Sequence, residues 1–389
     1  MGKYFKCFTD KNPVSYKLGE EITFTVFARE DGENITCENV KWEMQGDDGG
    51  DVKGTATITT EEPLIVKYTL KRAGFVHLNC VAMGENGEEI KDFEPLDSSA
   101  GVNVSELSYS DSLPHDFGEY WAEIEETIAN FPLEVVYYKE KDKNLREGFK
   151  EYEIRIKTPS GRPASGFVTI PEGNKKYPIR ISFLGYGAHV AHYEYDENMI
   201  CGCFNAHGFE NGYWEDIEKN YGKELANYGF NNDENASNKT TYFRNMMVRN
   251  LMALKYLKSL PQWDKKSVLS VGGSQGALQA ITLAAHDRDV TEVMAYKPWL
   301  CDLNSPNEGY LRGWRPDYAE GLRYFDTIAQ AMQLKCPITI ECYLGDYVCP
   351  PKTVLALYNS IKSEKKIRFI QSARHSYFPP ENEEISAEI

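Results

Sequence analysis

A serine between two glycines is the first feature of this 389-residue chain that predicts chemistry. Ser274 lies in Gly-Gly-Ser-Gln-Gly (272–276), after the apolar run 268–271 and before the helical pattern 277–285. A strand, Gly-x-Ser-x-Gly and a helix in this order are typical of a nucleophile elbow, the sharp turn that exposes a reactive serine. A serine hydroxyl is a weak nucleophile and needs a base within reach. The pattern therefore predicts nucleophilic catalysis, with a chance match in a glycine-containing turn as the alternative.

An aspartate and a histidine follow Ser274 in the order that a triad on a parallel sheet requires. Asp346 comes just after the strand-like run 338–344, and His375 comes after the strand-like run 367–370. The carboxyl ends of parallel strands meet at one edge of a sheet, so we expect the three side chains there. Taken alone, Asp346 is equally well explained as a turn residue and His375 as a loop histidine. Together with Ser274, they predict a catalytic triad.

The composition is that of a globular protein with an acidic bias. Lys and Arg number 43 against 59 Asp and Glu, which gives a formal charge of −16. Nucleic acids and anionic membranes bind basic faces, so neither is an expected partner. The nine cysteines are odd in number and scattered, which favours a reducing compartment, and they include no Cys-x-x-Cys pair that would indicate a metal site. No cofactor is expected. No signal-peptide core is visible, so we expect a cytoplasmic protein, or a secreted one if such a peptide has been removed.

Two regions of the chain differ in their hydrophobic period. Up to about residue 103, short alternating segments separated by turn clusters predict an antiparallel β-sandwich without a catalytic candidate. The polar stretch 98–114 is the expected domain boundary. From residue 179 onward, strands alternate with helices, which predicts an α/β domain whose mostly parallel sheet is covered on both faces. The expected domains are a sandwich over 1–105 and a catalytic domain over 106–389.

Five stretches between residues 113 and 380 resemble the acetyl xylan esterase / cephalosporin C deacetylase family of α/β-hydrolases (carbohydrate esterase family 7). They are Asp-Phe-Gly-Glu-Tyr-Trp (116–121), Phe-Leu-Gly-Tyr (183–186), the pentapeptide around Ser274, Lys-Pro-Trp-Leu (297–300) and Asp-Tyr-Val-Cys-Pro-Pro (346–351). The resemblance implies an α/β-hydrolase with a mostly parallel sheet. The N-terminal antiparallel β-sandwich lies outside it.

The resemblance implies a role for each matching position. Ser274 is the nucleophile, His375 the base, and Asp346 the residue that orients the histidine. The backbone N–H groups of Tyr186 and Gln275 form the oxyanion hole, which agrees with the general arrangement of this fold. The implied activity is a serine carboxylesterase that removes acetyl groups from sugar hydroxyls through an acyl-enzyme. Its substrate is an acetylated oligosaccharide or another small ester, and a homo-oligomer remains open.

The chain departs from the family around the expected pocket. Phe-Asn-Ala-His-Gly (204–208) stands where the family has Arg-Gly-Gln, residues 187–199 are too few for the usual helix, and Ser376 replaces a glutamate. We expect Tyr186 and Trp299 to bind the substrate, with packing in the core as an equal alternative. His207 is expected to line the substrate pocket or to support the oxyanion loop. Its alternative is a loop histidine without a partner.

Three other functions remain open from the sequence. The chain is alternatively a carbohydrate-binding protein with an inactive hydrolase domain, or a peptidase of the same fold. A metal-dependent deacetylase is the third, since His189, His192, Glu194 and Asp196 form a dense group of potential ligands. Their spacing fits no zinc signature, and Cys201 and Cys203 are too close together for a usual zinc pair.

Overall fold

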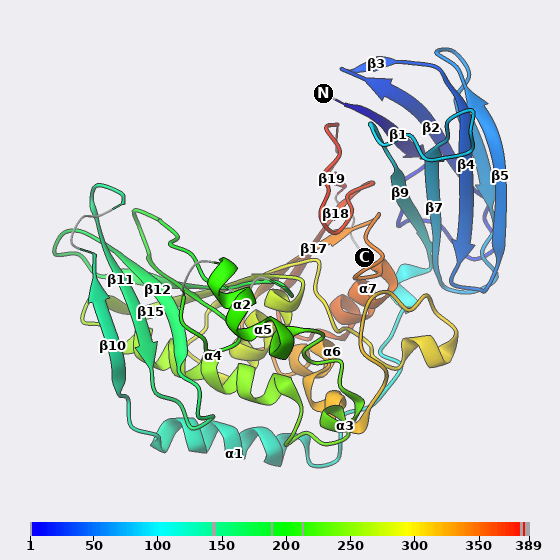
Figure 1. Cartoon of the computed structure of the whole chain (residues 1–389). Coiled ribbons are helices and arrows are strands. Elements are labelled where there is room, and N and C mark those ends of the chain that lie inside the picture. The colour runs from blue at the N-terminus through cyan, green and yellow to red at the C-terminus, as the bar shows by residue number, and fades with distance from the viewer. Residues whose placement is uncertain (1, 142–144, 188–189, 212–213, 382–383, 386–389) are drawn as a thin grey trace.

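The computed structural model describes residues 2–141, 145–187, 190–211, 214–381 and 384–385. Its first nine strands form two mostly antiparallel sheets that face each other, and its last ten strands form one large mixed sheet (Figure 1). All strands up to residue 102 belong to the two small sheets, and all strands from residue 135 belong to the large one. We therefore propose a domain boundary near residue 105.

The β-sandwich is built from strands whose apolar residues alternate with polar ones, as the sequence predicts. One sheet contains β1 (Lys3–Thr9), β2 (Ile22–Glu30), β3 (Glu33–Asn34), β6 (Leu64–Tyr68) and β8 (Phe93–Glu94). The other has the order β5 (Asp51–Ile58), β4 (Cys37–Gly46), β7 (Gly74–Ala82) and β9 (Leu96–Val102). Phe24, Met44 and Leu78 are fully buried between the sheets. Burial of one side of each strand is what holds two sheets together.

Strand β9 corrects the prediction of a polar boundary that begins at residue 98. Ser98 and Ser99 are both fully buried. Ser99 Oγ donates a hydrogen bond of 2.5 Å to the carbonyl oxygen of Leu344, and Gln371 Nε2 donates one of 2.5 Å to Ser98 Oγ. Buried hydroxyls need such partners. The hydroxyl groups of both serines thus bond to the catalytic domain, and the two residues do not lie in a solvated linker.

The large sheet has the strand order β10-β11-β12-β14-β13-β15-β16-β17-β18-β19. The strands are β10 (Val135–Glu140), β11 (Phe149–Ile156), β12 (Ala164–Pro171), β13 (Tyr177–Phe183), β14 (Ile200–Phe204), β15 (Trp263–Gly273), β16 (Glu292–Tyr296), β17 (Ile338–Tyr343), β18 (Lys365–Ile370) and β19 (Glu384–Ile385). Pairing is parallel from β14 through β18 and antiparallel at both ends. The parallel strands thus place their carboxyl ends along one edge.

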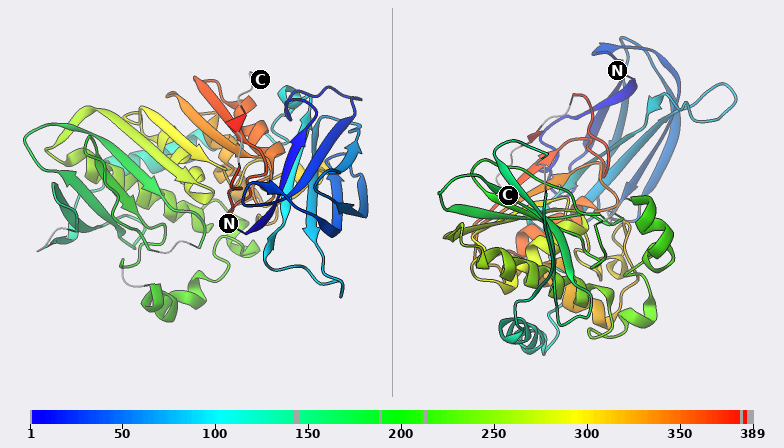
Figure 2. Two further views of the ribbon diagram at one scale, coloured as in Figure 1. Left: turned by 90° about the horizontal axis from the view of Figure 1, so that it is seen from above. Right: turned by 60° about the vertical axis from the view of Figure 1, so that its left-hand side comes forward.

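The helices are α1 (Phe117–Asn130), α2 (Trp214–Leu225), α3 (Asn232–Asn235), α4 (Tyr242–Ser259), α5 (Gln275–His286), α6 (Thr327–Ala331) and α7 (Pro351–Ser360). Three 3₁₀ turns are η1 (Val104–Glu106), η2 (Ser305–Glu308) and η3 (Glu320–Phe325). Figures 1 and 2 show α4, α5, α6 and α7 under the same face of the large sheet. No helix among the described residues is long and apolar enough to cross a membrane.

The prediction of a sheet covered by helices on both faces is wrong. Ile181 and Val293 point toward the helices and are fully buried, whereas Leu269, Met294 and Arg368 on the opposite face are partly exposed. In its described part, the connection between β13 and β14 contains no helix. Residues 184–187 and 190–199 therefore contribute no helix that would cover the second face.

Candidate active site

Ser274 occupies the tight turn between β15 and α5. Its φ of 57° and ψ of −122° lie in a region that residues with a side chain rarely adopt. The turn is held by a hydrogen bond of 2.9 Å from the Ser274 N–H to the carbonyl of Tyr296. A Cβ at Gly272 would lie 2.1 Å from the Gly276 oxygen, and a Cβ at Gly276 would lie 2.2 Å from the Phe183 oxygen. Both glycines are therefore required by the close approach of strand and helix.

Asp346 and His375 form a hydrogen-bonded pair at the same sheet edge. Asp346 follows β17 and is fully buried, and its Oδ2 lies 2.8 Å from Nδ1 of His375. Its other oxygen accepts 2.9 Å hydrogen bonds from the N–H groups of Val348 and Cys349. These bonds fix the carboxylate, and the carboxylate in turn fixes the imidazole through one nitrogen. The second ring nitrogen remains available for proton transfer.

Cys349 connects this pair to Ser274. The Cys349 sulfur and the ligand atoms of Asp346 and His375 all lie within 4.8 Å of one another. Burial raises the pKa of the Cys349 thiol well above its ordinary value, and a hydrogen bond from Ser274 acts in the opposite direction. Within the described residues, no hydrogen bond joins Ser274 to His375. The structure therefore pairs His375 with Asp346, one of the two contacts expected in a triad, and the catalytic roles of Ser274, His375 and Asp346 remain a prediction.

The two residues predicted to supply the oxyanion hole, Gln275 and Tyr186, belong to α5 and to the loop after β13. Gln275 is the first residue of α5, where a backbone N–H has no partner within the helix. The loop before Tyr186 is close to the serine, since a Cβ at Gly185 would lie 3.8 Å from Ser274 Cβ. Gln279 Nε2 donates a 3.1 Å hydrogen bond to the Leu184 carbonyl and ties this loop to α5. The role of the two N–H groups as oxyanion donors remains a prediction.

Five aromatic side chains pack against one another and form what we call the aromatic cluster: Tyr186, Tyr228, Phe230, Trp299 and Trp314. Tyr186 stacks on Tyr228 with a centroid distance of 4.2 Å and meets the edge of Trp314 at 4.6 Å. Trp299 is 1% exposed and donates a 2.6 Å hydrogen bond to the Trp314 carbonyl. Because the Trp299 ring is buried in the core cluster, the structure favours the alternative of packing in the core, and a role in substrate binding stays a prediction. Trp314, which is 40% exposed, is the tryptophan that solvent reaches.

His207 also requires a correction, since it is fully buried and cannot line a substrate pocket. Its Nδ1 lies 2.7 Å from the hydroxyl of Tyr242, and its ring meets Tyr228 edge-on at 4.7 Å. Tyr228 in turn donates a 2.8 Å hydrogen bond to Oε1 of Gln275 and lies 3.3 Å from the N–H of Gly187. The structure thus excludes the alternative of a loop histidine without a partner. Support of the oxyanion loop through Tyr228 remains our proposal.

Comparisons with known proteins show the family of this chain. The family model described as acetyl xylan esterase (AXE1) matches residues 103–307 and 315–387. The chain belongs to the acetyl xylan esterase family. It is an α/β-hydrolase and a carboxylic ester hydrolase, and its family and relatives support an acetyl esterase function.

A relative of this esterase and two solved structures that share its fold have low sequence identity to it. The acetyl esterase Axe7A of Xylanibacter ruminicola is 24% identical, over 90% of this chain and 82% of its own length. The acetyl xylan esterase structure from Paenibacillus sp. R4 has a TM-score of 0.59 at 18% identity, over 71% of this chain and 94% of its own. Acetyl xylan esterase 1 from Thermoanaerobacterium sp. JW/SL YS485 has a TM-score of 0.56 at 20% identity, over 71% of this chain and 93% of its own.

Several residues at the site of the esterase were not predicted. Tyr228 and Phe230 come from the long connection 208–239, and a loop of that length is itself a signal of function. Trp314 lies on a separate loop without such a signal. Lys297 has a positive φ of 41° and its Nζ donates a hydrogen bond to the carbonyl of His375. It holds the loop that carries the proposed base.

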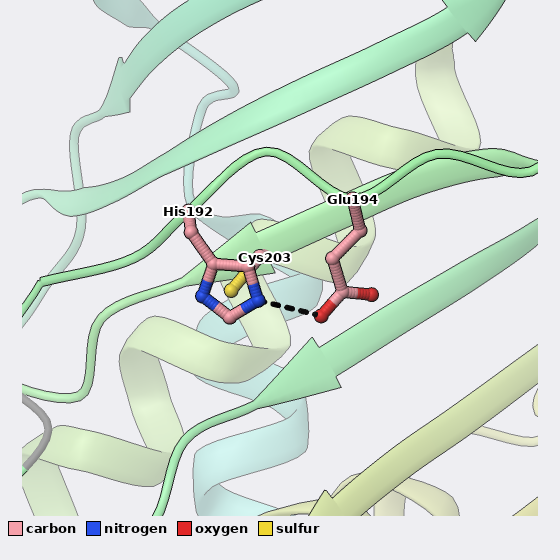
Figure 3. Close-up of side chains that lie close together, drawn as sticks. All are labelled: His192, Glu194 and Cys203. Carbon is pink, nitrogen blue, oxygen red and sulfur yellow. Dashed lines mark ion pairs between the residues drawn. The ribbon is translucent and has the colours of Figure 1, made fainter.

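A second group of polar side chains lies on the sheet face without helices (Figure 3). Nε2 of His192 is 3.3 Å from Glu194 Oε1, and the buried thiol of Cys203 is nearby. Glu194 also accepts a 2.7 Å hydrogen bond from Ser182 and lies 3.5 Å from Nε of Arg180. Because the Arg180 guanidinium already faces the Glu194 carboxylate, we interpret this group as an ion-pair network and not as a cation site. His189 lies outside the described residues.

Proposed function

We propose that the chain is a serine esterase that removes acetyl groups from sugar hydroxyls, with Ser274 as nucleophile, His375 as base and Asp346 as the residue that orients it. The observation that carries the proposal is the 2.8 Å contact between His375 and Asp346 beside a serine in the strained conformation of an elbow. Strained backbone at a non-glycine residue is typical of functional sites. Family membership supports the acetyl group as the acyl part.

In the first half of the proposed reaction, His375 takes the proton of the Ser274 hydroxyl as its oxygen attacks the ester carbonyl. The negative oxygen that develops is stabilised by the N–H groups of Tyr186 and Gln275. Loss of one such donor typically costs about 10²–10³ in rate. The tetrahedral intermediate then breaks its bond to the alcohol, which leaves with the proton from His375.

In the second half, water hydrolyses the acetyl-serine ester. His375 removes a proton from the water as it attacks the acyl carbon, and it returns that proton to the Ser274 oxygen when acetate leaves. Asp346 remains ionised and stabilises the imidazolium that forms in both halves. Serine and histidine are then ready for another substrate.

A short acyl group is proposed because two aromatic residues of the cluster have their backbone next to the nucleophile. The N–H of Trp299 donates a 3.3 Å hydrogen bond to the Ser274 carbonyl, and Tyr186 follows Gly185, whose added Cβ would lie 3.8 Å from Ser274 Cβ. One methylene changes discrimination by only about 1–3 kcal/mol, so selectivity against propionyl esters is expected to be mild. Turnover of octanoyl esters faster than of acetyl esters would contradict a short-acyl pocket.

The test is acetate release from p-nitrophenyl acetate and from acetylated xylo-oligosaccharides by the purified protein. We expect both substrates to be hydrolysed, and both activities to be lost in Ser274→Ala. Retention of activity in that variant would assign the chemistry to other residues. Absence of activity in the wild-type protein would instead favour a binding protein with an inactive hydrolase domain.

A further inference from the structure

A cleft of about 510 Å³ lies between the β-sandwich and the catalytic domain, next to His375. Glu94 and Asp97 of the sandwich line one side of it. The other side consists of the loop 345–348, which carries Asp346, and the loop 374–377, which carries His375. This volume is within the range of small-molecule sites in proteins.

The cleft contains the kinds of side chain that recognise hydroxyl groups. Arg374 forms an ion pair with Glu94, and its Nε lies 3.9 Å from Oδ2 of Asp97. The Arg374 guanidinium lies 4.6 Å from the ring centroid of Tyr377. Carboxylates accept hydrogen bonds, guanidinium groups donate them, and an aromatic ring packs on apolar CH groups. Since the cleft has two carboxylates, Glu94 and Asp97, and one guanidinium, that of Arg374, a neutral ligand is favoured over an anionic one.

The sandwich side of the cleft is held rigidly. Asp97 Oδ1 lies 2.7 Å from Nε2 of His77 and accepts a 3.0 Å hydrogen bond from Asn79. The His77 ring stacks at 3.6 Å on Tyr347, the residue after Asp346. A Cβ at Gly345 would lie only 2.3 Å from the carbonyl oxygen of Asp97, so the two backbones touch. The sandwich is therefore a fixed wall beside the proposed catalytic acid and base.

The cleft is also lined by His375, the proposed proton donor to the leaving alcohol. In the proposed reaction, His375 gives its proton to the departing alcohol, so that part of the substrate lies on the His375 side. Val348 lines the cleft, and its carbonyl accepts a 3.2 Å hydrogen bond from the N–H of Trp314. Trp314 packs on Tyr186 in the aromatic cluster. The cleft thus lies between His375 and the sandwich, and the backbone of Val348 connects its lining to the aromatic cluster.

We infer that this cleft binds the alcohol part of the ester, a neutral and hydroxyl-rich group such as the sugar chain of an acetylated oligosaccharide. Glu94 of the sandwich is the residue that most directly determines the preference for that alcohol, since it is half-buried and not part of the Asp97–His77 packing. The inference rests on the proposed esterase function. It gives the N-terminal domain a role in substrate selection.

The test compares two substrates in Glu94→Gln, a change that keeps the shape and removes the charge. We expect the ratio of kcat/KM for acetylated xylo-oligosaccharide to kcat/KM for p-nitrophenyl acetate to fall about tenfold, the order expected for one hydrogen bond to a charged group. Tyr377→Leu, which removes the ring, should lower the same ratio. Glu381→Gln is the matched control, because Glu381 contacts the sandwich outside the cleft and should leave the ratio unchanged.

An equal fall for both substrates, or no change in the ratio, would overturn the inference. Wild-type protein that hydrolyses p-nitrophenyl acetate through Ser274 but no acetylated saccharide would overturn the alcohol class and leave the esterase proposal intact. Binding of unacetylated xylo-oligosaccharide to Ser274→Ala, measured by calorimetry, gives an answer independent of turnover. Affinity weakened at least tenfold by Glu94→Gln supports the subsite, and absence of binding in Ser274→Ala itself contradicts it.

Discussion

At the scale of single residues, the site depends on a serine whose backbone is strained and a histidine whose ring is fixed. Ser274 keeps a positive φ because β15 and α5 hold it from both sides. His375 is fixed from two directions, by Asp346 at its ring and by Lys297 at its carbonyl. Such preorganisation is needed for proton transfer between groups that must meet within hydrogen-bond distance.

Asp346→Asn tests the orienting role of the carboxylate. Asparagine preserves the size of the side chain and keeps an oxygen for the N–H groups of Val348 and Cys349. It does not hold the imidazole in the required tautomer or stabilise the imidazolium. We expect kcat for p-nitrophenyl acetate to fall by about 10³–10⁴ with a small change in thermal unfolding midpoint. A loss below tenfold would show that Asp346 does not act on His375 in catalysis.

Tyr228→Phe tests the support of the oxyanion loop. The change removes a hydroxyl that bonds to the Gln275 side chain and lies against the N–H of Gly187. We expect kcat to fall about tenfold with little change in KM, because the effect acts on the position of the oxyanion donors. Tyr242→Phe is the control, since its hydroxyl contacts His207 one step farther away and its effect should be smaller. An equally large effect of Tyr242→Phe would show that the oxyanion loop is supported through His207.

At the scale of elements, the sequence predicts the features that depend on a local pattern of residues. The strand before Ser274, the helix after it and the order of Asp346 and His375 follow from hydrophobic period and motif. The aromatic cluster does not, because Tyr228 and Trp314 come from loops whose position depends on tertiary packing. The open face of the sheet was also missed. Alternation of helices and strands does not tell which face each helix covers.

Gly276→Ala tests the fit between α5 and β13. In a helix, alanine is ordinarily more stable than glycine by up to about 1 kcal/mol. At position 276 a methyl group would lie 2.2 Å from the backbone oxygen of Phe183, so we expect loss of soluble folded protein or a markedly lower unfolding midpoint. Gly118→Ala in α1 is the matched control, since no atom lies within 4 Å of its added Cβ. That variant should be as stable as the wild type or more stable.

At the scale of the whole molecule, the sandwich and the catalytic domain contact each other at several places. Sandwich residues Ser98, Ser99 and Asp97 touch the loops of the proposed acid and base, which explains why a serine-rich stretch is buried. A second contact lies farther away. Glu381, near the end of the chain, is bound by Tyr4, Lys6 and Arg29 of the sandwich.

The contact at Glu381 makes stability depend on pH. Hydrogen bonding from Lys6, followed by Tyr4 and Arg29, lowers the pKa of Glu381 from its ordinary value of 4.5 to about 2. Because the folded-state pKa is depressed, this contribution is complete above pH 4.5 and is lost as the pH falls toward 2. We expect the difference in urea unfolding midpoint between wild type and Glu381→Gln to be constant from pH 7 to 5. It should shrink below pH 4.5, and growth of the difference in acid would contradict this sign.

The whole account depends on Ser274 as the residue that attacks the ester, and covalent labelling tests this most directly. A fluorophosphonate ester reacts with serines that an adjacent base activates. Mass spectrometry of the digested protein should find one phosphonyl group on the peptide that contains Ser274. It should find none in Ser274→Ala and labelling slowed at least about 10²-fold in His375→Ala. A label on another residue, with acetyl esterase activity retained in Ser274→Ala, would contradict the assignment of the nucleophile.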